Sequence, residues 1–530
     1  MSGIGRASAL IGAGTVVSRL TGFLRAIVLV SAIGATSGAG NAFAIANQLP
    51  NNIYAIVSTG LLSAVVVPQI VKAAAHDDGG RAFISKLFTL GTVTLLAVTV
   101  VAVVAAPWLV QLYAPEFPPA QQALATAFAY WCLPQVFFYG LYALVGESLN
   151  ARRVFGPFTW APIVNNVVSI AGFIVFILLF GQTQAVSEWT PDMIALLGGT
   201  ATAGIVVQAL ILLLFWRRTG LHVRPDFRWR GVGLNHIGRL AGWTFLMVVA
   251  GQIAGLIQSQ VLSEAAERNP GIFVSQNAWL LFMLPYSIIV LSIGTPYFTQ
   301  LSEHAAKGRS DDVRSDIGRS IRTLGVFIVI ATFALAAAAV PASRIFTGSR
   351  EEAVGAAAVL VCFLVGLIPL AVLFVVQRTF YAYNDTRTPF FFTIVQCALV
   401  IATAWTARAL LPVESLAAGV ALGQSFASIV QVVIATWLLE RKLGRIGTAS
   451  WLFALGRFTL AAIPAAGVGW LVFVLFGGVD GWTASDKLLG AVGAAAIGIV
   501  SIAVYVGMLA LLRAPELEVA TQVVRRVLRR

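Results

Sequence analysis

The chain has 530 residues, of which 58% are hydrophobic and only 11% are charged. A soluble globular protein has about a quarter of its residues charged, and a disordered chain combines low hydrophobicity with high net charge, so both classes are excluded. The formal net charge is +13, from 35 Lys and Arg against 22 Asp and Glu. Such a balance can indicate nucleic-acid binding, but the distribution described below explains it without a nucleic-acid partner.

Fourteen apolar runs are each long enough to cross a bilayer, which takes about 20 residues of helix. They cover 9–33, 41–72, 83–113, 121–149, 157–181, 192–216, 239–262, 272–302, 320–343, 353–382, 389–411, 415–439, 457–479 and 488–512. The first run has no convincing small-residue cleavage site, so we expect a retained helix and not a signal peptide. The sequence therefore predicts an all-α integral membrane protein with 14 transmembrane helices.

The charges of the connecting segments give the orientation. With the N-terminus inside, the inner segments carry 28 Lys and Arg and the outer loops carry five, while Arg19 and Arg25 lie within the first run. Because cytoplasmic loops of membrane proteins are enriched in Lys and Arg, this alternation predicts that both termini are cytoplasmic.

Two stretches about 231 residues apart resemble each other. Leu149-Asn150-Ala151-Arg152 is similar to Phe380-Tyr381-Ala382-Tyr383, and each would end a helix on the inner side. The alternative is that inner helix ends look alike in any membrane protein. A true repeat of six helices predicts two six-helix lobes related by a pseudo-two-fold axis along the membrane normal. We then expect lobes over 1–218 and 219–445, with a C-terminal helix pair and a basic tail over 446–530.

Arg19 and Arg25 are the two charges in the middle of a predicted span. A central arginine costs about 3 kcal/mol on insertion scales, so it usually faces a cavity or a partner. The two side chains lie about 120° apart on a straight helix, and a bend at Thr21-Gly22 would turn both toward one space. Arginine suits phosphate because its planar fork donates two hydrogen bonds and stays charged. The alternative is that one arginine snorkels to an interface.

The second run carries an uncharged polar stripe. Asn41, Gln48, Asn52 and Thr59 fall within about 40° of one another at 100° per residue, and Tyr54 flanks them. Pro50, in the middle, is expected to kink or break the helix. Groups that both donate and accept hydrogen bonds suit a sugar or peptide head group. The alternative is helix–helix contact, since amides and hydroxyls bridge membrane helices.

Several kinds of site are not indicated by the sequence. No Asp or Glu lies in the middle of a run and all four histidines fall on the inner side, so a mid-membrane proton relay has no evident candidate. There is no Walker A sequence and no Cys/His spacing suited to zinc, and the three cysteines lie within apolar runs. We therefore expect no cofactor, no bound metal, no disulfide framework and no enzymatic activity.

Four stretches carry a family resemblance: Ser18-Arg19-Leu20-Thr21-Gly22-Phe23-Leu24-Arg25, Ala46-Asn47-Gln48-Leu49-Pro50-Asn51, Val67-Pro68 and the turn from Arg378-Thr379-Phe380-Tyr381 through Asn384-Asp385-Thr386-Arg387-Thr388-Pro389. They resemble the MurJ/MviN family of lipid II flippases, within the multidrug/oligosaccharidyl-lipid/polysaccharide exporter superfamily. The second stretch looks most like actinobacterial members. The resemblance covers essentially the whole chain.

This resemblance implies a transporter of peptidoglycan synthesis, and hence of cell wall biogenesis and cell shape, in the bacterial cytoplasmic membrane. It implies that Arg19 and Arg25 meet the diphosphate of lipid II, and it leaves wall-synthesis enzymes open as further partners beside membrane lipids. The chain departs from better-known members, which have an acid at Asn41 and arginines near Tyr54 and Leu280. It also offers no mid-span carboxylates for the family's sodium site, which puts sodium coupling in doubt.

The sequence thus favours a flippase that moves undecaprenyl-diphosphate-linked lipid II from the inner to the outer leaflet by alternating access. Its predicted substrate-binding residues are Arg19, Arg25, Asn41, Gln48, Asn52, Tyr54 and Thr59. A flippase for another polyprenyl-diphosphate sugar, such as a teichoic acid or capsule unit, shares every physical feature. A drug or cation antiporter is disfavoured by the missing carboxylate. A membrane glycosyltransferase would need a catalytic acid in an outer loop, and a passive scaffold would not explain buried arginines.

Overall fold

The computed structural model describes residues 3–59, 81–152, 154, 156–183, 185–219, 224–228, 234–265 and 269–517. The regular elements in these ranges are helices, and 13 helical stretches are long and apolar enough to cross a membrane. Each coincides with a predicted run. The remaining run, 41–72, begins as α2 (Gly38–Val57) and continues outside the described residues. The all-α multi-pass fold is confirmed, and the count of fourteen stays a prediction.

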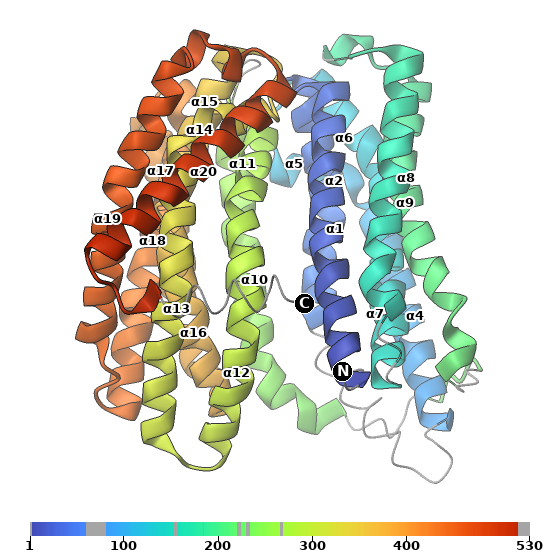
Figure 1. The fold of residues 1–530 in the computed structure, drawn as a ribbon. Helices are drawn as coiled ribbons and strands as arrows, with labels where there is room; N and C mark the ends of the chain where they lie inside the picture. The colour runs from blue at the N-terminus through green and yellow to red at the C-terminus, as the bar shows by residue number, and fades with distance from the viewer. Residues whose placement is uncertain are drawn as a thin grey trace. The chain divides into compact units, whose positions relative to one another are not determined.

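The helices pack into two compact units, 1–267 and 268–530 (Figure 1). The first unit contains α1 (Gly3–Ile33), α2, α4 (Arg81–Val104), α5 (Ala106–Tyr113), α6 (Pro119–Cys132), α7 (Gln135–Ala151), α8 (Gly156–Phe180), α9 (Pro191–Leu213) and α10 (Leu234–Leu262). The second contains α11 (Ile272–Pro285), a π-helical turn (Tyr286–Val290), α12 (Leu291–Ala306), α13 (Ser310–Ala337), α14 (Ala339–Arg344), α15 (Arg350–Leu364), α16 (Leu367–Ala382), α17 (Arg387–Leu410), α18 (Val413–Leu443), α19 (Thr448–Leu475) and α20 (Lys487–Leu511). The predicted division at 218 and 445 stays a prediction.

Helix α10 packs within the first unit, against α2 and α5. The Gln260 amide donates a hydrogen bond of 2.8 Å to the Leu112 carbonyl, and the backbone N–H of Glu116 donates one of 3.4 Å to the Ser263 hydroxyl. By its contacts α10 therefore belongs with the helices that precede it in the chain.

Among the residues that the structure describes, five of the predicted runs consist of two consecutive helices instead of one. In the first unit α4 ends before α5 at Ala105, and α6 is separated from α7 by Leu133 and Pro134. Proline has no N–H to donate and its ring clashes with the preceding turn, so a helix stops or restarts there. In the second unit the interruptions lie at the π-helical turn, at Ala338 and at Val365–Gly366. Apolar length reveals the span but not these interruptions.

The helix boundaries recur at the same offset that the sequence repeat showed. Three pairs of boundaries are 231 residues apart: the start of α6 at Pro119 and of α15 at Arg350, the end of α7 at Ala151 and of α16 at Ala382, and the start of α8 at Gly156 and of α17 at Arg387. The interruptions between α4 and α5 and between α13 and α14 are near the same offset. The recurrence supports an internal repeat, while the pseudo-two-fold axis stays a prediction.

The break expected as one outcome at Pro50 does not occur, while a bend at Thr21-Gly22 and a kink at Pro50 stay predictions. Helix α1 continues through Thr21 and Gly22 as regular α-helix, and α2 continues through Pro50 without a break. Membrane helices tolerate interior proline because neighbouring helices and polar groups can satisfy the freed backbone groups. The polar residues of both spans therefore sit on uninterrupted helices.

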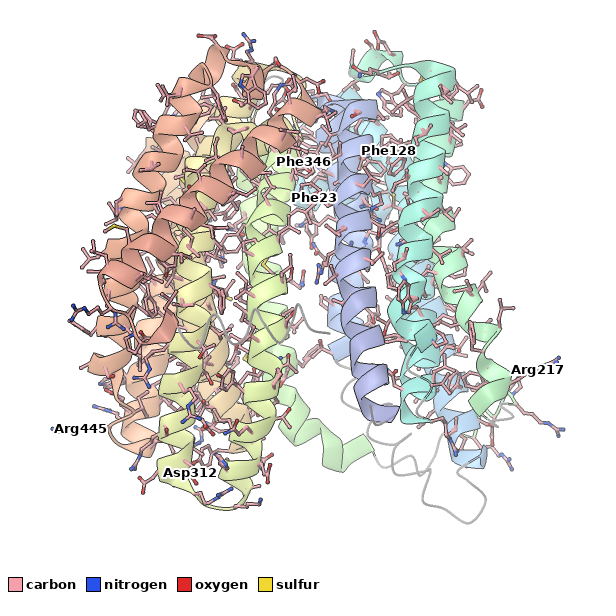
Figure 2. The ribbon with its side chains drawn as sticks, in the orientation of Figure 1. Phe23, Phe128, Arg217, Asp312, Phe346 and Arg445 are labelled. Atoms are coloured by element: carbon pink, nitrogen blue, oxygen red, sulfur yellow. The ribbon has the colours of Figure 1, made fainter. Side chains whose placement is uncertain are left out.

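Three predicted inner loops of the second unit lie together at one end of it. Lys442, near the end of α18, pairs with Asp385 at 2.6 Å, and Arg314 Nε donates to the Leu443 carbonyl at 2.7 Å. Figure 2 shows Asp312 and Arg445 at this end and Phe346 at the opposite end. The alternation inferred from charge thus agrees with which loops the fold brings together.

Candidate functional site

Helix α8 holds the part of α1 that carries Arg19. The Asn166 amide donates hydrogen bonds of 3.1 Å to the Ser18 carbonyl and of 3.0 Å to the Thr21 hydroxyl. This contact fixes the face of α1 that lies against α8. Arg19 is exposed, and Arg25, further along the helix, is half-buried.

Around Arg25 the fold gathers side chains from three helices of the first unit. Arg25 of α1 lies within electrostatic range of Tyr139 of α7. Tyr139 forms a hydrogen bond with the side chain of Asn51, and its ring packs against that of Tyr54 with centroids 5.6 Å apart. We call these four residues the Arg25 cluster. Its arginine and two phenols offer hydrogen-bond donors to an anion.

The remaining residues of the polar stripe differ in their surroundings. Asn52 donates a hydrogen bond of 3.2 Å to the Tyr113 hydroxyl and so bridges α2 to α5. Thr59 donates to the Ala55 carbonyl of its own helix at 2.9 Å. Asn41 is buried near the start of α2, and Gln48 is half-buried. Asn41 precedes Asn51 by ten residues, about 15 Å along the helix, so it lies apart from the Arg25 cluster.

The structure therefore brings Arg25 and Tyr54 together but does not gather the whole predicted set. Asn52 makes the helix–helix contact that was the alternative interpretation of the stripe. Tyr139 and Tyr113 were not among the predicted residues. The signal that reveals them is a phenol within an otherwise apolar span, since a buried tyrosine hydroxyl usually needs a polar partner.

The charges of this region are not all of one sign, because Glu147 of α7 lies within electrostatic range of Tyr54. Within the described part of the chain, neither Arg19 nor Arg25 forms an ion pair with a carboxylate. Among the described residues, no three His, Cys, Asp or Glu side chains are grouped so as to hold a metal ion. An unpaired arginine inside a membrane span favours a site that receives its counter-charge from a ligand.

The family described as lipid II flippase MurJ matches this sequence over residues 29–484. The chain belongs to this family. It is similar to the probable lipid II flippase MurJ of Rhizobium meliloti (strain 1021), with 26% identity over 505 residues that cover 92% of this chain and 91% of the relative. The corresponding protein of Haemophilus influenzae is 25% identical over 407 residues, which cover 71% of this chain and 75% of the relative.

Solved structures show the same fold. A lipid II flippase MurJ in an inward closed conformation matches with a TM-score of 0.74 and 18% identity, covering 95% of this chain and 98% of the other. An inward-facing multidrug resistance transporter of the MATE family, in the MOP superfamily, matches with a TM-score of 0.65 and 15% identity, covering 82% and 96%. Family membership makes the chain a membrane transporter and not an enzyme.

Proposed function

We propose that this protein flips lipid II, the undecaprenyl-diphosphate-linked precursor of peptidoglycan, from the inner to the outer leaflet of the bacterial cytoplasmic membrane. Family membership supports the substrate. The observation that carries the proposal in this chain is the unpaired Arg25 beside Tyr139 and Tyr54, with Arg19 on the same helix.

The chemistry of the arginines fits the most strongly charged part of this substrate. A diphosphate presents oxygens that accept paired N–H donors from a guanidinium, and this charge-assisted pairing is strong where water is scarce. Tyr54 and Asn51 add donors that suit the sugar or peptide beside the diphosphate. The polyprenyl tail stays in the bilayer, where no polar partner is needed.

The orientation and the transport cycle belong to the same proposal. The excess of Lys and Arg in alternate segments supports cytoplasmic termini, and the clustering of three such loops in the second unit supports the alternation. We propose that two lobes of the repeat alternate access to a central site, as in other transporters built from repeats. The two positive charges in the middle of the first span, Arg19 and Arg25, make the cycle sensitive to membrane potential, since one charge crossing 100 mV is worth about 2.3 kcal/mol.

Complementation tests this function. The chain is expressed in a bacterium whose own lipid II flippase can be switched off, and surface-accessible lipid II is measured together with growth. We expect both to be restored. A correctly inserted protein that leaves lipid II inside would contradict lipid II as the substrate and favour another polyprenyl-diphosphate sugar.

A further inference from the structure

The second unit contains a cavity of about 310 Å³ that the function described above does not use. It is lined by α16 and by the π-helical turn, with Arg378, Gln377 and Tyr381 on one side and Tyr286 on the other. π-Helical turns are rare and occur frequently at functional sites. The polar residues that line this cavity can all donate hydrogen bonds.

Arg378 is the one charged residue among the described residues that line the cavity, and aromatic rings hold it in place. Its guanidinium carbon lies 5.1 Å from the ring centroid of Phe298 and 5.3 Å from that of Phe374. Within the described residues it forms no ion pair. Asp385, the nearest carboxylate along the chain, is already taken by Lys442 at 2.6 Å and by the Thr388 hydroxyl at 2.9 Å.

The neutral donors have protons free for a ligand. The Gln377 amide donates a hydrogen bond of 2.9 Å to the Tyr381 hydroxyl, so that this oxygen acts as an acceptor and keeps its own proton for another partner. The Tyr286 ring packs against Phe374, and its hydroxyl has no hydrogen-bond partner among the described residues. A cation and two phenol protons facing one cavity form a donor set for an oxyanion.

Helix-end snorkelling, the ordinary explanation of an arginine near an inner helix end, does not account for this arrangement. Arg441 shows the ordinary case: it also lies at such an end and stacks on Trp437 at 3.7 Å, but it is exposed. Arg378 is half-buried and lines a cavity instead.

We propose that the Arg378 cavity is an oxyanion site that binds a phosphate of a lipid head group. Two sources share this chemistry: the diphosphate of the transported lipid, which rests on the proposed function, and an ordinary anionic phospholipid. In either case the second unit carries a phosphate site built from residues other than those of the Arg25 cluster.

The test uses the full chain in phosphatidylcholine nanodiscs with inorganic diphosphate as the probe. The double variant Arg19→Ala/Arg25→Ala is the starting protein, so that the sites of α1 do not contribute. Adding Arg378→Gln should weaken the remaining diphosphate binding about tenfold or more, because charge-assisted hydrogen bonds are lost. Adding Arg441→Gln, the matched control, should change it less than twofold. Equal binding with and without Arg378 would overturn the proposal.

Three further measurements keep the result interpretable. Arg378→Lys retains the charge and should bind more tightly than Arg378→Gln, while Tyr381→Phe should weaken binding without removing a charge.

Phosphatidylglycerol that competes with diphosphate in an Arg378-dependent manner identifies a phospholipid as the source, whereas competition by lipid II alone identifies the substrate. If complementation fails but Arg378-dependent diphosphate binding remains, the proposed function falls and the oxyanion site stands.

Discussion

The two units share a scaffold but not a set of charges. Helix ends at Ala151 and Ala382 and helix starts at Gly156 and Arg387 recur 231 residues apart. At the same offset, Glu147 of α7 corresponds to Arg378 of α16, so one position carries opposite charges in the two copies. Apolar length, prolines and glycines set the helix boundaries. These boundaries therefore stay in place when the charge of a half-buried side chain is reversed. A repeat therefore preserves where helices begin and end more faithfully than what they bind.

The first helices of the two copies show the same contrast. The offset places Ala250 and Leu256 of α10 where α1 has Arg19 and Arg25. Their packing differs too, because α1 lies against α8 whereas α10 lies against α2 and α5. The cations at these two positions are thus present in the first copy and absent from the second.

Removing these cations is expected to have the largest effect. Arg19→Ala/Arg25→Ala should abolish surface exposure of lipid II in the complementation strain while membrane insertion and expression remain, because the diphosphate loses its counter-charge. Arg217 is an exposed arginine at one end of the first unit (Figure 2). The variant Arg217→Ala is the matched control and should retain activity. A fully active double variant would show that the two arginines, which α1 has and α10 lacks at the corresponding positions, are not needed for transport.

Sequence reasoning located the helices well because burial in a bilayer demands about 20 apolar residues and excludes charges. The repeat was predicted from the polar turn at each inner helix end, and the recurring helix boundaries support it. Sequence reasoning could not reveal that α6 and α7 form a broken span, because Leu133-Pro134 interrupts an apolar run without changing its polarity. It also did not assign α10 to the first unit, since only contacts such as Gln260 with Leu112 show that.

A contact between a glycine and a threonine on neighbouring helices occurs in both units, with the two residue types exchanged between the helices. It offers a second test of the comparison. In the first unit Gly172 of α8 faces Thr200 of α9, and a Cβ at Gly172 would lie 2.6 Å from Cβ of Thr200. In the second unit the residue 231 positions later is Thr403, and it faces Gly423, where an added Cβ would again lie 2.6 Å from the threonine Cβ. Each helix pair thus has room for one threonine.

We expect Gly172→Thr to lower the free energy of unfolding by about 1–3 kcal/mol, because a Cβ is fixed to the backbone and the helices must separate. The double variant Gly172→Thr/Thr200→Gly installs the arrangement of the second unit and should recover most of this loss. Thermal unfolding in detergent measures both. Gly467→Ala, where an added Cβ meets nothing within 4 Å, is the control and should be neutral or slightly stabilising. Failure of the double variant to recover would show that the two contacts are not interchangeable.

The site was harder to predict than the scaffold. Arg25 and Tyr54 could be named from sequence because a charge and a polar stripe are conspicuous in apolar spans. Their partner Tyr139 could not, since a tyrosine is common in membrane helices and only the packing of α1, α2 and α7 joins the three. The same limit explains why Arg378 was noticed only as part of a turn. Its cavity depends on Tyr286, which lies 92 residues away in the chain.

The smallest expected effect concerns a turn of the second unit that is closed by a charged pair. Asp385 accepts hydrogen bonds from Lys442 at 2.6 Å and from the Thr388 N–H at 3.0 Å, whereas the corresponding residue of the first unit is Val154. Burial raises the pKa of Asp385, but these hydrogen bonds outweigh it and bring the pKa below its ordinary value of 3.8. Because folding lowers the pKa of Asp385, its carboxylate stabilises the folded protein fully at pH values above the ordinary pKa. This stabilisation is lost as the pH falls through the lowered pKa of the folded state.

Asp385→Asn should therefore lower stability at neutral pH by up to about 1 kcal/mol, as expected for a partly exposed pair. The difference between the parent protein and the variant should shrink as the pH falls below about 4. Unfolding midpoints measured across that range in detergent test this. Asp311→Asn removes a carboxylate that is 95% exposed and pairs with Arg314 at 2.8 Å, so it should change the midpoint less. Equal effects of the two substitutions at neutral pH would mean that the contacts of Asp385 give the second unit no more stability than an exposed ion pair does.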